Sequence, residues 1–243
     1  MSNIDRVLVV VPALNEERSI ADVVTSVRSH GWDCLVVDDG SSDSTRSRAS
    51  ASGAAVVSLA TNLGVGAALR AGFRYAVMEG YTRVVQCDAD GQHRAEQIAH
   101  LVATARSQDA DLVIGSRFLA PDEDSMSVAS HRRKVMGFLS WIVRHQTGVQ
   151  VSDTTSGFKC VSQPLLGEFA IEFPAHFLGD TFEACLVAAN NGYLIVEVPA
   201  TMNERKHGKS SASALQAVRF ILRSVAVAFF GLTFQIAVKA QHS

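Results

Sequence analysis

The stretch RVVQCDADGQH, Arg83–His93, places two aspartates one residue apart at the end of an apolar run. Asp and Gly are common where a strand ends, because Asp hydrogen-bonds its own backbone and Gly accepts a positive φ. The carboxylates of Asp88 and Asp90 could also hold a divalent cation, since Mg²⁺ and Mn²⁺ take oxygen ligands. This stretch alone leaves a turn and a metal site open, so the rest of the chain has to decide between them.

Short β-branched runs alternate with helical patterns through the first half of the chain. Continuous apolar strands that alternate with helices are typical of a parallel sheet covered on both faces. We therefore predict an α/β fold with a mostly parallel central sheet. The predicted strands are 6–13, 34–40, 54–60, 83–88 and 111–116, and the predicted helices are 16–30, one that starts within 41–49, 64–79 and 94–107.

The second half is less regular. The length of 243 residues, a hydrophobic content of 47% and the lack of a Pro/Gly/Ser-rich linker suit one large domain, with or without an appendage. Helical patterns cover 130–147, 164–170 and 180–191, a strand is predicted over 193–200, and a long helix starts at Ser213. We predict a main domain over 1–212 and a C-terminal helical extension over 213–243.

Carboxylates gather at the ends of three of the five early strands. They are Glu16, the pair Asp38 and Asp39, and the pair Asp88 and Asp90. Ligands of such sheets bind at the carboxyl ends of the strands. Like charges that are brought together repel each other unless a cation is present, so this clustering favours a metal site over a simple turn.

The predicted metal is Mg²⁺ or Mn²⁺ held by Asp88 and Asp90, which can point to one side from an extended or turn geometry. The side-chain oxygen of Gln92 is a candidate third ligand. His93 could also be a ligand, but we expect an exposed loop histidine there. A metal held in this way neutralises a diphosphate and stabilises its charge as a leaving group.

Charge is unevenly distributed along the chain. Residues 125–150 carry +4 and residues 201–243 carry +5, so the remainder carries −11 within a net charge of −2. Surface charge often serves solvation alone. Here basic segments late in the chain and acidic motifs early in it also suit a metal-bridged anion held between them.

Cysteine usage and the N-terminus bear on the compartment. The four cysteines lie in apolar surroundings at unrelated spacings, which predicts buried free thiols in a reducing compartment. The first residues show no long apolar run after a basic segment, so we expect no signal peptide. A cytoplasmic protein is therefore predicted.

One glycine-rich stretch imitates a cofactor motif. NLGVGAALRAG, Asn62–Gly72, resembles a dinucleotide fingerprint, but Leu69 stands where a third Gly or Ala belongs. No carboxylate ends a strand about twenty residues further on, as that fingerprint requires. We predict a helix N-terminus with small residues for close packing instead.

Seven motifs occur in a fixed order: VVVPALNEE (9–17), VVDDGSSDST (36–45), NLGVGAALRAGF (62–73), QCDADGQH (86–93), IGSRF (114–118), DTTSGFK (153–159) and NERKHGKSS (203–211). The series closely resembles family 2 glycosyltransferases of the dolichyl-phosphate mannose/glucose synthase-like group. Each motif alone is weak, whereas seven in register are specific. The resemblance spans residues 6 to about 212.

The resemblance implies a GT-A fold and a metal-dependent inverting transferase. Its donor would be a GDP- or UDP-linked hexose, its acceptor a polyprenyl phosphate, and no nucleic acid is expected as a partner. The matching motifs imply that the nucleotide pocket is lined by Pro12, Leu14 and Glu16, and that the base and ribose are faced by Val37 and Asp39. They imply that the metal and diphosphate are served by Asp88, Ala89, Asp90 and Gln92. They also imply that Arg117 lies near the sugar or acceptor, and that Arg205 and Lys209 close over the diphosphate from a basic loop.

The catalytic base is left open. A phosphate acceptor is already anionic near neutral pH, whereas a sugar hydroxyl needs a general base. Asp153 matches an acceptor-side acid of the family, and Asp180 and Glu183 compete with it. The sequence PAHFLGD, 174–180, departs from the more acidic sequence of many relatives. A small soluble hydroxyl compound therefore stays open as the alternative acceptor.

The C-terminal extension departs from relatives that carry several transmembrane helices. Between Arg223 and Lys239 lie fifteen largely apolar residues, fewer than the ~20 that a membrane span needs. Residues 213–240 are expected to lie on the surface of a membrane, or to pack on the main domain or a second subunit of a homo-oligomer. The protein would then be cytoplasmic, either free or peripheral at the inner face of the membrane.

Two other classes of function fit the sequence less well. A non-catalytic nucleotide-binding protein predicts the loss of a carboxylate or basic motif, and none is lost. A nucleotidyltransferase would share the sheet and the metal, but the chain has no Gly-rich basic N-terminal loop that would hold a triphosphate.

Overall fold

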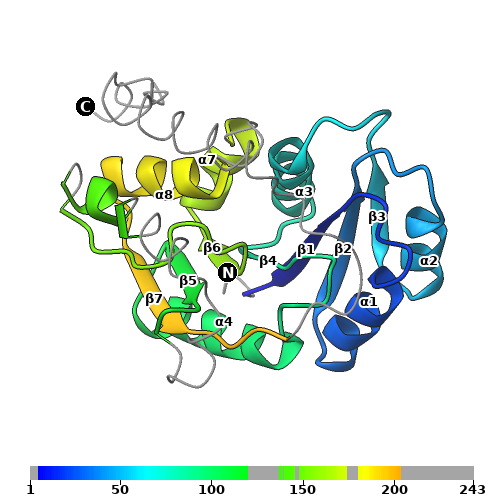
Figure 1. Cartoon of the computed structure of the whole chain (residues 1–243), viewed down its shortest axis with the longest axis horizontal. Helices are drawn as coiled ribbons and strands as arrows, with labels where there is room; N and C mark the ends of the chain where they lie inside the picture. Colours follow the sequence, from blue (N-terminus) through cyan, green and yellow to red (C-terminus); the bar gives the residue numbers. More distant parts are fainter. Residues whose placement is uncertain (1–4, 120–136, 139, 146–147, 174–179, 204–243) are drawn as a thin grey trace.

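The computed structural model describes residues 5–119, 137–138, 140–145, 148–173 and 180–203 (Figure 1). Its strands are β1 (Val7–Ala13), β2 (Asp33–Asp38), β3 (Ala55–Ser58), β4 (Arg83–Gln86), β5 (Leu112–Ser116), β6 (Lys159–Ser162) and β7 (Ile195–Pro199). Its helices are α1 (Ile20–Ser29), α2 (Thr45–Ala51), α3 (Val65–Met78), the short 3₁₀ helix η1 (Ala95–Gln97), α4 (Ile98–Ser107), α7 (Leu165–Ile171) and α8 (Asp180–Asn190).

The seven strands form one sheet in the order β3-β2-β1-β4-β6-β5-β7. Every neighbouring pair is parallel except the two that β6 makes, because β6 runs antiparallel to both β4 and β5. The predicted mostly parallel α/β sheet is therefore confirmed. The order reverses direction at β1, where β2 and β4 flank it, and such a switch point is where ligands bind in open α/β sheets.

Helices cover both faces of the sheet and create two apolar cores (Figure 1). On one face α3, α7 and α8 pack over the sheet, and Phe73, Phe169 and Phe173 meet there as an aromatic cluster. On the other face α1, α2 and α4 contribute their apolar residues. Strands buried on both faces explain why β1 and β4 read as continuous apolar runs rather than as alternating patterns.

The glycine-rich stretch Asn62–Gly72 leads into α3 and allows this helix to pack closely on the sheet. A Cβ at Gly72 would lie 2.5 Å from Cγ1 of Val10, so only glycine lets α3 approach β1 this closely. The helix begins after Gly64, which has a φ of +92°. The prediction of a closely packed helix N-terminus is confirmed.

All four cysteines are buried free thiols, as predicted. Burial raises the pKa of the Cys34 and Cys160 thiols to about 12, so both stay protonated and unreactive.

The sequence patterns missed β6. The segment Lys159–Ser162 has only four residues, and a lysine and a serine stand at its ends. It becomes a strand because it fills the space between β4 and β5, where Lys159 pairs with both Gln86 and Ile114. Pairing between distant segments decided this element rather than local preference.

The late helices and strand agree with their patterns where the structure describes them. α7, α8 and β7 lie where helices at 164–170 and 180–191 and a strand at 193–200 were predicted. Of the predicted helix 130–147, residues 140–145 are helical, and residues 130–136 lie outside the described ranges. No helix in the described ranges has the length and apolar character needed to cross a bilayer. The extension 213–243 lies outside them.

Candidate functional site

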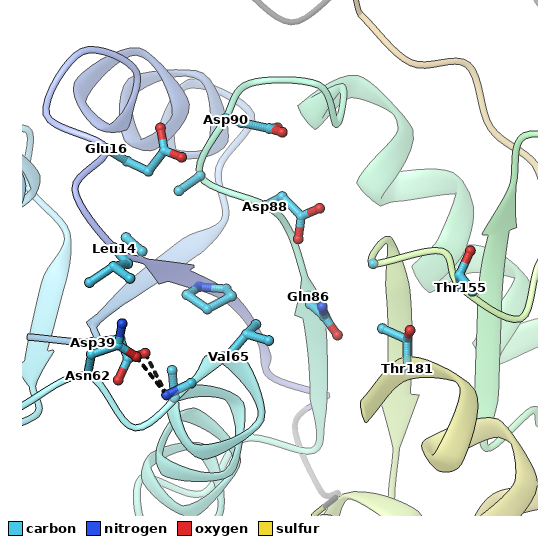
Figure 2. A pocket seen from close by; sticks show the side chains of 16 residues that line it. Leu14, Glu16, Asp39, Asn62, Val65, Gln86, Asp88, Asp90, Thr155 and Thr181 are labelled. Carbon is cyan, nitrogen blue, oxygen red and sulfur yellow. Dashed lines mark hydrogen bonds between the residues drawn. The ribbon is translucent and has the colours of Figure 1, made fainter. Parts of the chain in front are cut away.

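A cleft of about 380 Å³ opens at the carboxyl ends of β1, β2 and β4 (Figure 2). It brings together residues that the sequence motifs placed in three separate stretches. Seven of the predicted site residues line it: Pro12, Leu14, Glu16, Asp39, Asp88, Ala89 and Asp90. Their convergence follows from the parallel order of the three strands, whose ends meet at one edge.

Asp39 forms one wall of the cleft together with the start of α3. Its Oδ1 accepts the N–H of Leu63 at 2.8 Å, and its Oδ2 accepts the N–H of Gly64 at 2.8 Å. The carboxylate thereby fixes the loop that precedes α3 against the end of β2. A carboxylate oxygen has two lone pairs, so each can accept one further bond from the cleft side.

Glu16 lies on the β1 side of the same wall. Its Oε2 accepts the hydroxyl hydrogen of Ser19 at 2.9 Å, and its backbone N–H donates to the hydroxyl of Thr45 at 2.8 Å. Leu14 is 37% exposed, which leaves an apolar surface beside these polar groups. An apolar wall next to hydrogen-bonding groups is the usual composition of a small-ligand site.

Four predicted site residues in the described part of the chain do not line the cleft: Val37, Gln92, Arg117 and Asp153. The side chain of Val37 is fully buried in the core under α3, because it lies on the same face of β2 as Leu35. Its expected contact with a base is wrong for the side chain. Gln92 is not among the lining residues either, and its backbone N–H donates to Oδ1 of Asp90 at 3.0 Å. The role of its side chain as a third metal ligand stays a prediction.

His93 supports Asp88 from beneath. Its side chain is only 4% exposed and stacks on Phe158 with ring centroids 4.9 Å apart, so the expected exposed loop histidine is wrong. Its Nδ1 accepts the backbone N–H of Asp88 at 2.9 Å. The neutral ring then carries its proton on Nε2, which lies 3.6 Å from Oδ2 of Asp88.

Gly157 leaves the space that the Asp88 carboxylate occupies. A Cβ at Gly157 would lie 2.9 Å from both carboxylate oxygens. The side chain of Asp88 is 42% exposed, whereas Asp90 is 9% exposed and its Oδ1 holds the N–H of Gln92. Asp88 therefore offers the more accessible oxygens, and Asp90 the more rigidly held ones.

The two aspartates fit a divalent metal that binds together with a phosphorylated ligand. In the part of the chain that the structure describes, no group of three or more His, Cys, Asp or Glu side chains could hold a metal by itself. Mg²⁺ commonly keeps one or two carboxylates, substrate phosphates and water as ligands. The chemistry of this donor set matches that pattern.

Arg117 and Asp153 form a fork behind Thr155, a lining residue of the cleft to which Nη2 of Arg117 donates at 3.3 Å. Nε and Nη2 of Arg117 each donate at 2.8 Å to one carboxylate oxygen of Asp153, and the backbone N–H of Arg117 donates to Oδ2 at 3.2 Å. Asp153 is completely buried. Burial alone would raise its pKa, but the hydrogen bonds and charge of Arg117 outweigh burial and hold the pKa of Asp153 below its ordinary value.

This fork is braced by Glu197 of β7, which the sequence analysis did not identify. Its Oε1 accepts the N–H of Asp153 at 2.9 Å, and its Oε2 accepts the N–H of Ser152 at 2.7 Å. The hydroxyl of Ser152 donates to Oε1 as well, at 3.0 Å. The one sequence feature that points to Glu197 is its position as an acidic residue inside the apolar run YLIVEVPA, 193–200.

Lys159 connects the centre of the sheet with the start of α8. It is 3% exposed, and its Nζ donates to the carbonyl of Thr181 at 2.9 Å and to Sγ of Cys185 at 3.4 Å. Thr181 lines the cleft opposite Asp88. The buried lysine therefore fixes one end of this wall.

The other predicted candidates differ in how far the structure describes them. Glu183 is not among the lining residues of the cleft, and the side chain of Asp180 lies outside the described part. Arg205 and Lys209 also lie outside it, so their expected closure over the diphosphate stays a prediction. Polar lining residues that the sequence analysis missed are Asn62, Gln86, Thr155 and Thr181.

Comparisons with known proteins agree with this arrangement. The sequence model described as "Glycosyl transferase family 2" matches residues 8–166. Polyprenol monophosphomannose synthase of Mycolicibacterium smegmatis is 33% identical over 86% of this chain and 81% of its own length. Undecaprenyl-phosphate mannosyltransferase of Micrococcus luteus is 34% identical over 86% of this chain and 88% of its own length.

A solved structure shares the fold. Glucosyl-3-phosphoglycerate synthase from Mycobacterium tuberculosis, in complex with Mg²⁺ and UDP, superimposes with a TM-score of 0.68. The match covers 93% of this chain and 79% of that chain, at 24% sequence identity. The fold is therefore that of the GT-A glycosyltransferases.

Proposed function

The chain belongs to glycosyl transferase family 2, and we propose that it transfers a hexose from a nucleoside-diphosphate sugar to a polyprenyl phosphate. One observation carries this proposal: a single cleft holds Asp39, Asp88 and Asp90, and the fork of Arg117 and Asp153 reaches it through Thr155, a lining residue to which Nη2 of Arg117 donates at 3.3 Å. The two relatives named above are, by their names, a polyprenol monophosphomannose synthase and an undecaprenyl-phosphate mannosyltransferase, which supports the acceptor.

The donor would lie along the cleft with its nucleoside at the β1–β2 end. Leu14 supplies an apolar surface for a base, and Asp39 keeps lone pairs for ribose hydroxyls. Asp88 and Asp90 would hold Mg²⁺ or Mn²⁺ at the diphosphate, and the bound ion would neutralise the leaving group. Whether the base is guanine or uracil, and whether the hexose is mannose or glucose, is what the donor assay below measures.

The state of Asp153 supports a phosphate acceptor over a hydroxyl acceptor. A hydroxyl nucleophile needs a base with a free oxygen, but both oxygens of Asp153 hold Arg117, and its pKa is lowered. Such a carboxylate takes up a proton poorly. A phosphate monoester already carries negative charge and needs no base.

In this mechanism Arg117 binds the acceptor phosphate. Its side chain is 24% exposed, and its Nη1 makes no hydrogen bond to any residue within the described ranges. Asp153 orients the guanidinium, and Glu197 orients Asp153. The phosphate oxygen would approach the anomeric carbon from the side opposite the diphosphate, so the configuration would invert. Arg205 and Lys209 would neutralise the departing diphosphate.

We further propose that residues 213–240 lie at the inner surface of the membrane and bring the cleft to its lipid acceptor. Arg219 and Arg223 would contact anionic headgroups, and the apolar second half of the segment would enter the headgroup boundary. A main domain over 1–212 would then work as a peripheral enzyme. Packing of the same segment against a second subunit is the competing arrangement.

The test is direct transfer in vitro. Radiolabelled GDP-mannose, UDP-glucose and UDP-N-acetylglucosamine are each incubated with the full chain, Mn²⁺ and undecaprenyl phosphate. We expect label from one donor to enter a butanol-extractable lipid in a product that mild acid releases as free sugar. Asp90→Asn serves as the inactive control. Label that stays water-soluble with added soluble hydroxyl compounds, and never reaches the lipid, would contradict the proposed acceptor.

A further inference from the structure

Gln86 occupies an unusual position in the cleft. It is the last residue of β4, two residues before Asp88, and it is only 4% exposed. Side chains alternate along a strand, so Gln86 follows Val84 on the face that packs beneath α3. An apolar side chain would suit this face, yet the strand ends in an amide that lines the cleft.

The amide of Gln86 has no hydrogen-bond partner in the protein as described. Neither its oxygen nor its nitrogen bonds to any side chain or backbone group of residues 5–119, 137–138, 140–145, 148–173 or 180–203. Such a side chain has two donors and an acceptor oxygen. Because Gln86 lines the cleft, the partner that its amide meets there comes from outside the chain, as water or as a bound ligand.

The direction of the Gln86 side chain shows where a partner from outside the chain would lie. Figure 2 shows the side chain below Asp88, pointing across the cleft toward Thr181. Leu14 and Asp39 lie together on the left of Figure 2, whereas Asp88, Gln86 and Thr181 lie to the right of them. A donor with its nucleoside at Asp39 and its diphosphate at Asp88 would place the group attached to the diphosphate beside Gln86.

The chemistry of an amide suits that group. A hexose carries neighbouring hydroxyls that each donate and accept, and one amide can donate to one hydroxyl while it accepts from the next. A phosphate offers acceptors only and would leave the amide oxygen unsatisfied. The nearby carboxylates of Asp88 and Asp90 would repel an acidic sugar, and Gln86 adds no positive charge that would offset them.

We infer that Gln86 is a specificity-determining residue whose amide binds hydroxyl groups of the transferred hexose and selects a neutral sugar. This inference rests on the proposed function, because it requires that a nucleotide sugar binds in the cleft. It adds the residue that recognises the sugar, which neither the sequence motifs nor the named relatives identify.

The experiment compares each nucleotide sugar with its free nucleotide. Binding of GDP-mannose and GDP, UDP-glucose and UDP, and UDP-N-acetylglucosamine and UDP is measured by calorimetry with Mn²⁺, for the wild-type chain and for Gln86→Met. Methionine keeps the length of the side chain and removes its hydrogen bonds. We expect about tenfold weaker binding of the preferred nucleotide sugar, as for a lost hydrogen bond of ordinary strength, and unchanged binding of the free nucleotide.

The unliganded protein gives a second readout. The amide of Gln86 makes no hydrogen bond to the described residues, so Gln86→Met loses none and should melt at the same temperature as the wild type or higher. Gln97→Met is the control for ligand binding, because Gln97 does not line the cleft and its Nε2 donates to the hydroxyl of Thr201 at 2.6 Å. This control should bind all ligands as the wild type does. Gln86→Leu provides a second apolar variant in case methionine packs poorly.

Each contrary outcome identifies what failed. Wild-type affinity of both Gln86 variants for the preferred nucleotide sugar would overturn this inference and leave the proposed function intact. Equally weakened binding of the nucleotide sugar and of the free nucleotide would also overturn it, because Gln86 would then support the turn that carries Asp88 and Asp90 rather than the sugar. If the wild-type chain binds no nucleotide sugar more tightly than its free nucleotide and transfers none, the proposed function falls and this inference with it.

Discussion

Replacing Asp153 by asparagine separates its role as a partner of Arg117 from a role as general base. The substitution keeps the shape of the side chain and removes the charge that three N–H groups of Arg117 contact. Arg117 stays protonated at any working pH, so it would lose its counter-ion. Removal of one partner of a buried ion pair costs about 3–5 kcal/mol. Because Arg117 is 24% exposed and can be partly hydrated, we expect the lower end, about 3 kcal/mol.

The assay is a double-mutant cycle by urea unfolding at pH 7, with Asp153→Asn, Arg117→Gln and the double variant. Arg117→Gln leaves a fully buried carboxylate and should cost about 4 kcal/mol. The double variant has two neutral amides that can bond to each other, so its loss should be smaller than the sum of the single losses by about 2 kcal/mol or more. Additive losses, within about 0.5 kcal/mol, would refute the argument that the pair acts as a unit.

The pH dependence gives an independent check with a definite sign. The pKa of Asp153 is lowered in the folded protein from its ordinary value of 3.8, so the ionised carboxylate makes its full contribution to the free energy of unfolding above that value. It is lost only as the pH falls through the lower folded pKa. The stability difference between wild type and Asp153→Asn should therefore be equal at pH 7 and pH 5.5. In transfer assays the variant should raise the KM for undecaprenyl phosphate and keep the shape of the pH–rate profile, whereas the loss of an acidic limb would identify a base.

Three further results are expected. Asp90→Ala should abolish Mn²⁺-dependent transfer, and near-wild-type turnover would refute the metal assignment. Its loss of the bond to the N–H of Gln92 should cost about 1 kcal/mol of stability. Gly157→Ala should displace the Asp88 carboxylate and raise about tenfold the Mn²⁺ concentration that gives half-maximal binding, as measured by electron paramagnetic resonance. An unchanged concentration would show that the side chains at the 2.9 Å contacts move apart freely. In flotation assays the full chain should bind anionic liposomes less tightly as salt rises, and a version ending at Ala212 should not bind; a full chain that never floats would contradict the surface segment.

The sequence predicted the sheet and the position of the cleft because both follow from local patterns. Apolar runs that end in Asp39 and Asp88 are visible without knowledge of any distant contact. The parallel order of β1, β2 and β4 then brings those ends together. The turn that carries Asp88 and Asp90 and the wall formed by Asp39 are therefore predictable from single segments of the chain.

Other features depend on partners that are distant in the sequence. His93 looked like an exposed loop residue because nothing near it indicates Phe158, on which it stacks. Val37 was expected to face a base because a motif match does not say which face of a strand a side chain takes. Glu197 braces a loop 44 residues earlier in the chain, and no local pattern reveals that contact.

The antiparallel strand β6 has a consequence for the order in which the chain can fold. β5 and β7 are not hydrogen-bonded to β4 directly, because β6 lies between them. A chain emerging from the ribosome can pair β1 to β4 early, but β4 keeps an open edge until residues 159–162 have been synthesised. An unpaired edge is a template for association between chains. Nascent chains that stall between β5 and β6 should therefore aggregate through β4, whereas release after β6 should give soluble, protease-resistant protein.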